Sequence, residues 1–122
     1  MKTQKIKLNY PEDAYTFVRE SVNFAISRLT EPRHISAFEL LENCKLYAQN
    51  QYGLLTQTVL ENWRIKSADD IGNIVFELID AGLLSADPAD SRKDFSIKFD
   101  LFDHDVLRVR YERSKIEPLI ND

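Results

Sequence analysis

The chain has 122 residues, of which 43% are hydrophobic and 30% are charged, and these values are typical of one globular domain and not of a disordered segment. Sixteen basic and twenty acidic side chains give a formal net charge of −4, which opposes the phosphate attraction behind non-specific nucleic-acid binding. The single cysteine, Cys44, excludes an intramolecular disulfide and any zinc site with several cysteines, and it indicates a reducing compartment such as the cytoplasm.

Two helices are predicted in the first half of the chain. The first should begin at Pro11 and continue to about residue 29, because apolar residues recur there at steps of three and four. Ser36 and Glu39 match the capping box, in which a serine oxygen and a glutamate three residues later accept from free backbone N–H groups. A second helix should therefore begin at this serine and end near Gly53, since glycine commonly closes a helix.

Two further helices are predicted over residues 54–63 and 68–81. Ser67 and Asp70 repeat the capping pattern, and the apolar residues that follow form one strong stripe. Gly72 lies inside the last of these helices, where glycine costs about 1 kcal/mol relative to alanine. We therefore expect close packing against another backbone at this glycine.

Alternating apolar and polar residues after these helices predict two β-strands, over residues 95–100 and 107–111. Two helices joined by a short turn and followed by strands are typical of a winged helix-turn-helix domain. The sequence thus predicts a single, mainly helical α+β domain over 1–122. Its parts are an N-terminal arm (1–10), N-terminal helices (11–52), a winged-helix-like part with short β-strands (54–112) and a tail (113–122).

Two stretches resemble known families. Residues 78–84 with 87–92 are similar to the passage from helix to wing in multiple-antibiotic-resistance-type repressors, which implies a fold but little about function. More widely, residues 34–42, 59–63 and 70–76 resemble a family of small uncharacterised bacterial proteins, and this resemblance implies no activity, cofactor or partner. The chain departs from that family's pattern in three residues, namely Ala37 and Arg64, where glycine is usual, and Ile71, where an aromatic residue is usual.

The leading functional prediction is a non-enzymatic protein-interaction module whose helix over 68–81 faces a partner. This helix carries several acids, and neither Lys nor Arg occurs between Lys66 and Arg92. Its one aromatic residue, Phe76, lies off the apolar stripe, which fits either a residue that contacts another protein or a helix with a broad buried face. The partner would be another protein or a second copy in a homodimer, bound through Asp69, Asp70, Phe76 and Asp80.

Two alternatives belong to other functional classes. A DNA-binding, transcription-regulator-like protein would use Arg92, Lys93, Arg108 and Arg110, although the acids of the helix over 68–81 would oppose phosphate binding. An enzyme would use a metal ion or a cysteine–histidine pair, and the candidate residues are Asp100, Asp103, His104 and Asp105 for the metal, and Cys44 and His34 for the pair. No cofactor is predicted, since no glycine-rich phosphate loop is present, and no apolar run is long enough to span a membrane.

Overall fold

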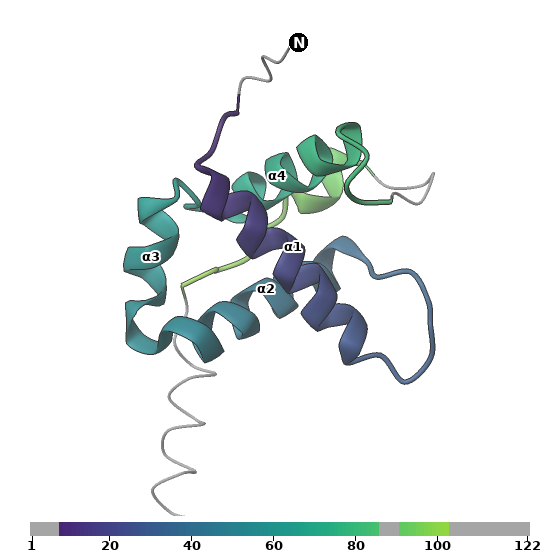
Figure 1. Cartoon of the computed structure of the whole chain (residues 1–122). Coiled ribbons are helices and arrows are strands. Elements are labelled where there is room, and N and C mark those ends of the chain that lie inside the picture. The colour runs from purple at the N-terminus through teal and green to yellow at the C-terminus, as the bar shows by residue number, and fades with distance from the viewer. Residues whose placement is uncertain (1–7, 86–90, 103–122) are drawn as a thin grey trace, which may run out of the picture.

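The computed structural model describes residues 8–85 and 91–102 (Figure 1). Within these residues four α-helices follow one another, which are α1 (Glu12–Ser27), α2 (Ala37–Tyr52), α3 (Thr56–Asn62) and α4 (Ala68–Asp80). Two short 3₁₀ helices accompany them, η1 (Gly53–Leu55) before α3 and η2 (Arg92–Phe95) after α4. The four helices expected from the sequence are present, with ends close to those expected.

Serine capping boxes set the starts of α2 and α4. At α2, the backbone N–H of Glu39 donates to the Ser36 hydroxyl at 3.1 Å, and the Glu39 carboxylate accepts from the backbone N–H of Ser36 at 3.0 Å. At α4, the Asp70 carboxylate accepts from the backbone N–H groups of Lys66 and Ser67 at 2.8 and 3.2 Å. Each box satisfies N–H groups that a helix start leaves unpaired, so both predicted starts are confirmed.

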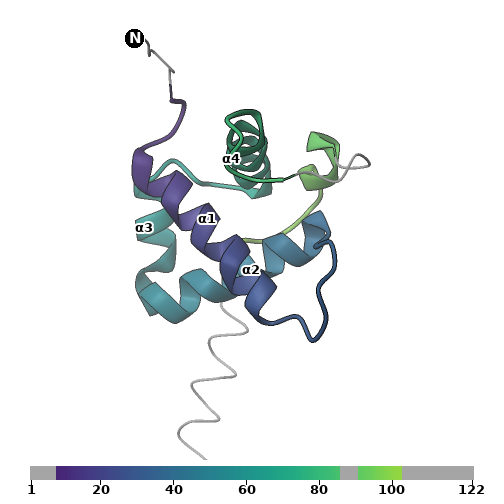
Figure 2. The ribbon, with the colours of Figure 1, turned by 45° about the vertical axis from the view of Figure 1, so that its right-hand side comes forward.

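Helix α1 packs against both α2 and α4 (Figures 1 and 2). The view in Figure 2 shows α1 in front, with α4 above it and α3 to one side. Each helix turns one apolar stripe inward, and the buried residues include Ala14, Phe17, Val18, Leu41, Cys44, Ala48, Leu60, Ile71, Ile74 and Leu78. The four helices therefore share one hydrophobic core, and α3 and α4 do not form a unit separate from the N-terminal helices.

The predicted winged-helix α+β fold is wrong, because the parts of the chain that the structure describes contain no β-strand. The predicted strand over 95–100 is instead the end of η2 followed by an extended segment, and the one over 107–111 lies outside the described residues. The start of η2 uses the same chemistry as the α-helix starts. Asp94 accepts from the Ser91 N–H at 3.0 Å, and the Lys93 N–H donates to the Ser91 hydroxyl at 3.1 Å.

Burial explains why alternation was misleading in this segment. Phe95 is buried, but Ile97, two residues later, is 41% exposed, so the alternating residues do not share one buried face. The segment runs between α4 and α2 (Figure 1), where Leu101 is buried and the Lys45 ammonium donates to the Asp100 carbonyl at 2.9 Å. Because α2 and α4 flank this segment (Figure 1), no described strand lies beside it, and a strand without a partner is not stable.

Gly72 does make a close approach, but the nearest atoms are those of the Phe95 side chain, at the end of η2, and not those of another backbone as the sequence predicted. A Cβ atom on Gly72 would lie 2.6 Å from the Phe95 Cβ and 2.9 Å from its Cγ. These atoms are at the base of the Phe95 side chain, so they cannot move aside without η2. The absence of a side chain at residue 72 therefore allows η2 to pack on α4.

We expect the substitution Gly72→Ala to lower the free energy of unfolding by up to about 2 kcal/mol. Overpacking costs about 1–3 kcal/mol, which exceeds the gain of about 1 kcal/mol that alanine brings to a helix interior. Urea denaturation followed by circular dichroism would measure the change. In a Phe95→Gly background the clash is absent, so the same substitution should become neutral or stabilising; a similar loss in both backgrounds would contradict this explanation.

Arg64 has a φ of +66°, in the left-handed region that non-glycine residues rarely adopt. It follows α3 at the position where glycine commonly ends a helix, and the Ile65 N–H donates back to the Leu60 carbonyl at 2.9 Å, as in a Schellman motif. The backbone at Arg64 is therefore strained in order to turn the chain from α3 into α4.

A comparison of Arg64→Gly with Arg64→Ala should measure this strain. Both variants lose the hydrogen bond from the Arg64 guanidinium to the Asn9 carbonyl at 3.2 Å, so that contribution cancels. We expect the glycine variant to be more stable than the alanine variant by about 1 kcal/mol, because only glycine adopts a positive φ without steric cost. Equal unfolding free energies for the two variants would show that the turn is not strained.

Candidate functional site

The two acidic residues at the start of α4 have partners within the protein. The Asp70 carboxylate accepts from the Tyr10 hydroxyl at 2.7 Å, in addition to its two backbone N–H donors. Asp69 accepts from the Ser96 hydroxyl at 3.0 Å. Asp80, at the other end of α4, is exposed. The acids that the sequence assigned to one partner-facing surface therefore lie at opposite ends of the helix, and two of them hold neighbouring segments in place.

A second carboxylate of α4, Glu77, binds the segment that leads into α1. The Tyr15 hydroxyl donates to its Oε1 atom, and the Asn9 amide donates to its Oε2 atom at 2.5 Å. The Asn73 amide extends the network by donating to the Tyr10 hydroxyl at 3.1 Å. These bonds tie residues 9–15 to one face of α4.

Burial raises the pKa of Tyr10 and of Tyr15 to about 12. The hydrogen bonds to Asp70 and Glu77 act in the same direction, because a phenolate beside a carboxylate would be repelled. The fold thus favours the neutral phenols, and removal of their protons would break the contacts between α4 and the start of α1.

The basic residues of the DNA-binding alternative are only partly within the described chain. Arg92 donates to the Asn73 side-chain oxygen at 3.2 Å, and its guanidinium carbon lies 5.7 Å from the centre of the Phe76 ring. Lys93 is exposed on η2, while Arg108 and Arg110 lie outside the described residues. Arg92 is therefore engaged within the protein.

Of the four metal-site candidates, the structure describes only Asp100. Its carboxylate accepts from the backbone N–H of Phe102 at 3.0 Å, which fits a local turn. Asp103, His104 and Asp105 lie outside the described residues. Within residues 8–85 and 91–102, no group of three histidine, cysteine or acidic side chains is placed to hold a metal ion.

Cys44 does not have the surroundings of a reactive thiol. It is 1% exposed, burial raises its pKa to about 12, and a hydrogen bond with Ser21 opposes that shift only in part. Nucleophilic cysteines need a lowered pKa, because the thiolate is the reactive form. His34, the proposed partner, is exposed on the loop between α1 and α2. The observed chemistry favours a core thiol over a catalytic pair.

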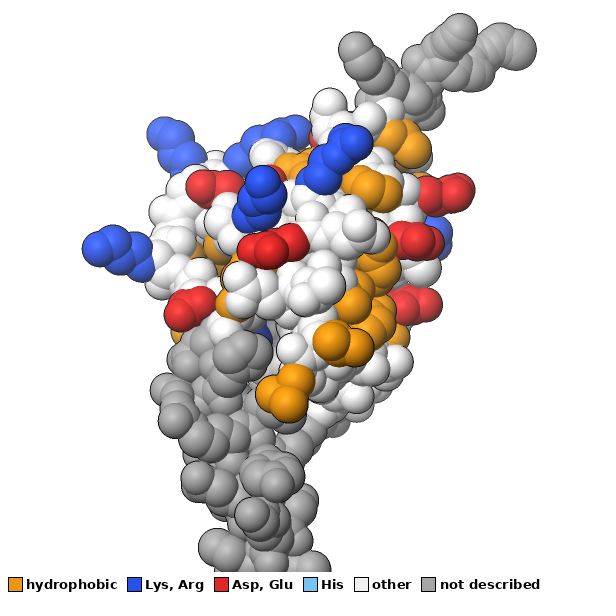
Figure 3. All heavy atoms as spheres, turned by 90° about the vertical axis from the view of Figure 1, so that its left-hand side faces the viewer, with side chains coloured by type: hydrophobic (Ala, Val, Ile, Leu, Met, Phe, Trp, Pro, Cys, Tyr) orange, Lys and Arg blue, Asp and Glu red, His pale blue; other side chains and the backbone are white. Residues whose placement is uncertain are grey.

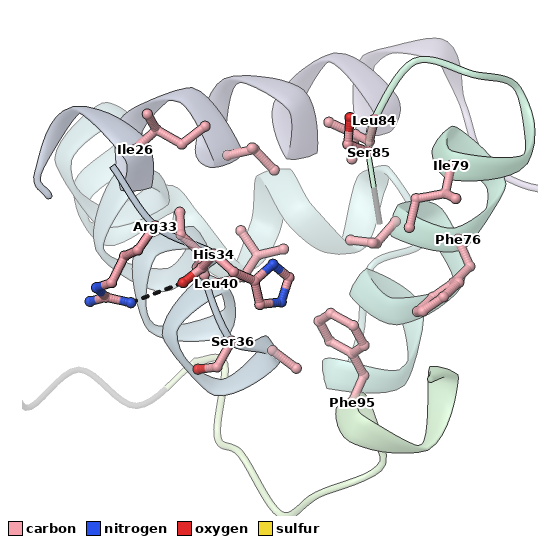
Figure 4. Close-up of a pocket in the computed structure, with 14 residues that line it drawn as sticks. Ile26, Arg33, His34, Ser36, Leu40, Phe76, Ile79, Leu84, Ser85 and Phe95 are labelled. Atoms are coloured by element: carbon pink, nitrogen blue, oxygen red, sulfur yellow. Dashed lines mark hydrogen bonds between the residues drawn. The ribbon is translucent and has the colours of Figure 1, made fainter. Parts of the chain in front are cut away.

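An apolar pocket of about 270 Å³ lies between α1, the loop before α2, α4 and η2 (Figure 4). Ten of its lining residues are apolar, which are Val22, Ile26, Ile35, Ala37, Leu40, Val75, Phe76, Ile79, Leu84 and Phe95. The rings of Phe76 and Phe95 meet edge to face, with centroids 6.2 Å apart. We call this site the Phe76 pocket.

The polar rim of the Phe76 pocket comes mainly from the loop before α2. Its polar lining residues are Arg33, His34, Ser36 and Ser85. The Arg33 guanidinium points away from the pocket in Figure 4 and forms a two-pronged ion pair with Glu39 at 2.7 and 2.9 Å. This arginine is the only lining residue that is always charged, so the pocket suits a neutral, apolar group.

The sequence pointed to one wall of the Phe76 pocket and did not indicate the others. Phe76 was singled out because it lies off the apolar stripe of its helix, and the structure places it at the pocket. The opposite wall comes from Val22 and Ile26 of α1, about fifty residues earlier in the chain. Ile26 is 52% exposed although it belongs to the apolar period of its helix, so this wall became visible only in the structure.

Searches with the whole chain found no matching family model, no matching curated protein and no matching solved structure. The resemblance to a family of small bacterial proteins therefore stays a prediction. Among the described helices, none is long and apolar enough to cross a membrane.

The tyrosine contacts predict a loss of stability at alkaline pH. An unfolded tyrosine ionises near pH 10, whereas Tyr10 and Tyr15 in the fold ionise near pH 12. Their contribution is thus complete below pH 10 and is lost as the pH rises toward 12. Urea denaturation at several pH values would measure this decline, and the Tyr10→Phe/Tyr15→Phe variant should decline less steeply. An identical pH dependence for both proteins would refute the assignment.

Proposed function

We propose that the protein is a non-enzymatic protein-interaction module that receives an apolar side chain of its partner in the Phe76 pocket. The observation that carries this proposal is the apolar lining of the pocket. Its only permanently charged lining residue, Arg33, is neutralised by an ion pair with Glu39. The proposal keeps the class of function expected from the sequence, and it moves the contact from the acids of α4 to Phe76 and its neighbours.

The size of the pocket supports an anchor of one large side chain. A cavity of about 150 Å³ already holds benzene, so a volume of about 270 Å³ is sufficient for a phenylalanine, leucine or tryptophan side chain. Anchors of this kind, buried in a preformed pocket, supply most of the free energy of binding in protein interfaces. The two phenylalanine rings offer an edge and a face for contact with an aromatic anchor.

Three described groups with the potential for chemistry are engaged within the fold. Asp70 and Glu77 are used to hold the start of α1, and Cys44 is buried. We place the interaction in the cytoplasm, because a single, buried thiol suits a reducing compartment.

A selection from a displayed peptide library would test the proposal without a known partner. We expect the enriched peptides to share one large apolar residue and to bind the wild type at least about tenfold more tightly than the Ala37→Phe variant, whose added ring fills the pocket. Titration of fluorescent peptides would measure both affinities.

The matched control is Ala81→Phe, which adds the same ring to an exposed residue just after α4, away from the Phe76 pocket. This control should bind the selected peptides as the wild type does. If no peptide family is enriched, or if the enriched peptides bind the Ala37→Phe variant equally well, the proposed function is wrong.

A further inference from the structure

The corner at which α2 passes into α3 exposes two consecutive leucines, and we call it the leucine corner. Leu54 is 81% exposed and Leu55 is 64% exposed, which makes them the most exposed of the large apolar side chains in the described residues. On the face that carries α3, hydrophobic side chains reach the lower part of the molecule, whereas most charged ones gather above (Figure 3). Exposed apolar side chains that are adjacent commonly mark a contact surface.

The leucine corner is held in a defined conformation by buried hydrogen bonds. Thr56 is 1% exposed, and its hydroxyl lies 2.6 Å from the Gly53 carbonyl and 3.2 Å from the Ala48 carbonyl. Gly53 has a φ of +56°, which lets the chain turn sharply at the end of α2. The two leucines are therefore displayed by a fixed turn, and little conformational entropy would be lost when they are covered.

The leucine corner lies in the part of the chain that is poorest in charged residues. Residues 46–60 form the longest run in the chain without Asp, Glu, Lys or Arg, in a protein of which 30% is charged. The exposed polar side chains next to the leucines are those of Gln51, Gln57 and Thr58, and the Gln57 amide donates to the Glu61 carboxylate at 3.0 Å. The amide of Gln51 and the hydroxyl of Thr58 can each donate and accept hydrogen bonds, so each can pair with an identical group, which a charged side chain cannot do.

We propose that a second copy of this chain docks on the leucine corner and that the two copies form a homodimer related by a two-fold axis. Such a contact brings identical surfaces together, so a charged surface would meet its own charge. Two copies with a net charge of −4 repel each other elsewhere, but a corner with little charge and an apolar centre reduces this cost. The contact is small, so we expect weak association, with a Kd on the order of 0.1 mM.

This inference goes beyond the proposed function, because the leucine corner shares no residue with the Phe76 pocket. Either surface can therefore bind when the other is altered. Peptides selected for the pocket should bind a variant of the corner unchanged, so a failure of one proposal leaves the other intact.

Sedimentation velocity of the full chain between about 0.01 and 1 mM tests the dimer. The wild type should shift from monomer to dimer over this range, and the Leu54→Gln/Leu55→Gln variant should remain a monomer. The matched control is Leu83→Gln/Ile97→Gln, which removes two exposed apolar side chains, 51% and 41% exposed, elsewhere on the surface. This control should form a dimer as the wild type does.

The salt dependence of the dimer separates an apolar contact from a charged one. Because the leucine corner carries no charge, the Kd should change less than about twofold between 50 and 500 mM NaCl. A wild type that stays monomeric at 1 mM, a dimer that survives in the Leu54→Gln/Leu55→Gln variant, or a dimer that dissociates at high salt would each overturn the proposal.

Cross-linking gives a second measurement that does not depend on removal of the leucines. Cys44 is buried, so a cysteine introduced as Leu55→Cys would be the accessible thiol among the described residues. A short bismaleimide should join two Leu55→Cys chains and leave chains with the control substitution Ile97→Cys mostly monomeric. Equal cross-linking of the two variants would also overturn the proposed contact.

Discussion

The fold depends on the burial of the apolar face of α4. Ile71, Ile74 and Leu78 of this helix are buried in the core that α1 and α2 complete. The Phe95 side chain belongs to the same core and packs on the helix at Gly72. Burial of several large aliphatic side chains stabilises a domain by about 1.5–3 kcal/mol each relative to exposure. Helix α4 packs directly on α1 and η2, and α1 in turn packs on α2, so the burial of this face joins both ends of the described chain into one core.

The polar residues of α4 complete this arrangement and limit what they can do elsewhere. Asp70 accepts three hydrogen bonds, and Glu77 holds Tyr15 and Asn9. A carboxylate that is used in this way is costly to redirect toward a partner or a substrate, because the donors that it leaves would lose their acceptor. The Asp70 and Glu77 carboxylates of the helix therefore serve mainly to hold the start of α1.

The two surfaces that carry our proposals differ in how they arise. The Phe76 pocket forms because η2 and the loop before α2 cover α4 incompletely, which leaves a concave apolar space. The leucine corner forms because Thr56 and Gly53 turn the chain tightly, which leaves no room to bury the leucines between them. One surface accepts a side chain of another molecule, and the other offers its own side chains.

Local chemistry made the helices predictable from the sequence. Ser36 with Glu39 and Ser67 with Asp70 marked helix starts because a capping box acts over three residues, and the apolar period of each helix showed its buried face. The sequence by itself also determined that Gly72 must meet another segment. Only the tertiary structure decided that residues 95–100 pair with no strand among the described residues. It also decided that Asp70 and Glu77 bind tyrosines some sixty residues away, and that Val22, Ile26 and Phe76 line one pocket. These contacts join residues that are far apart in the chain. The pattern of apolar and polar residues within one segment does not show which other segments will pack against it.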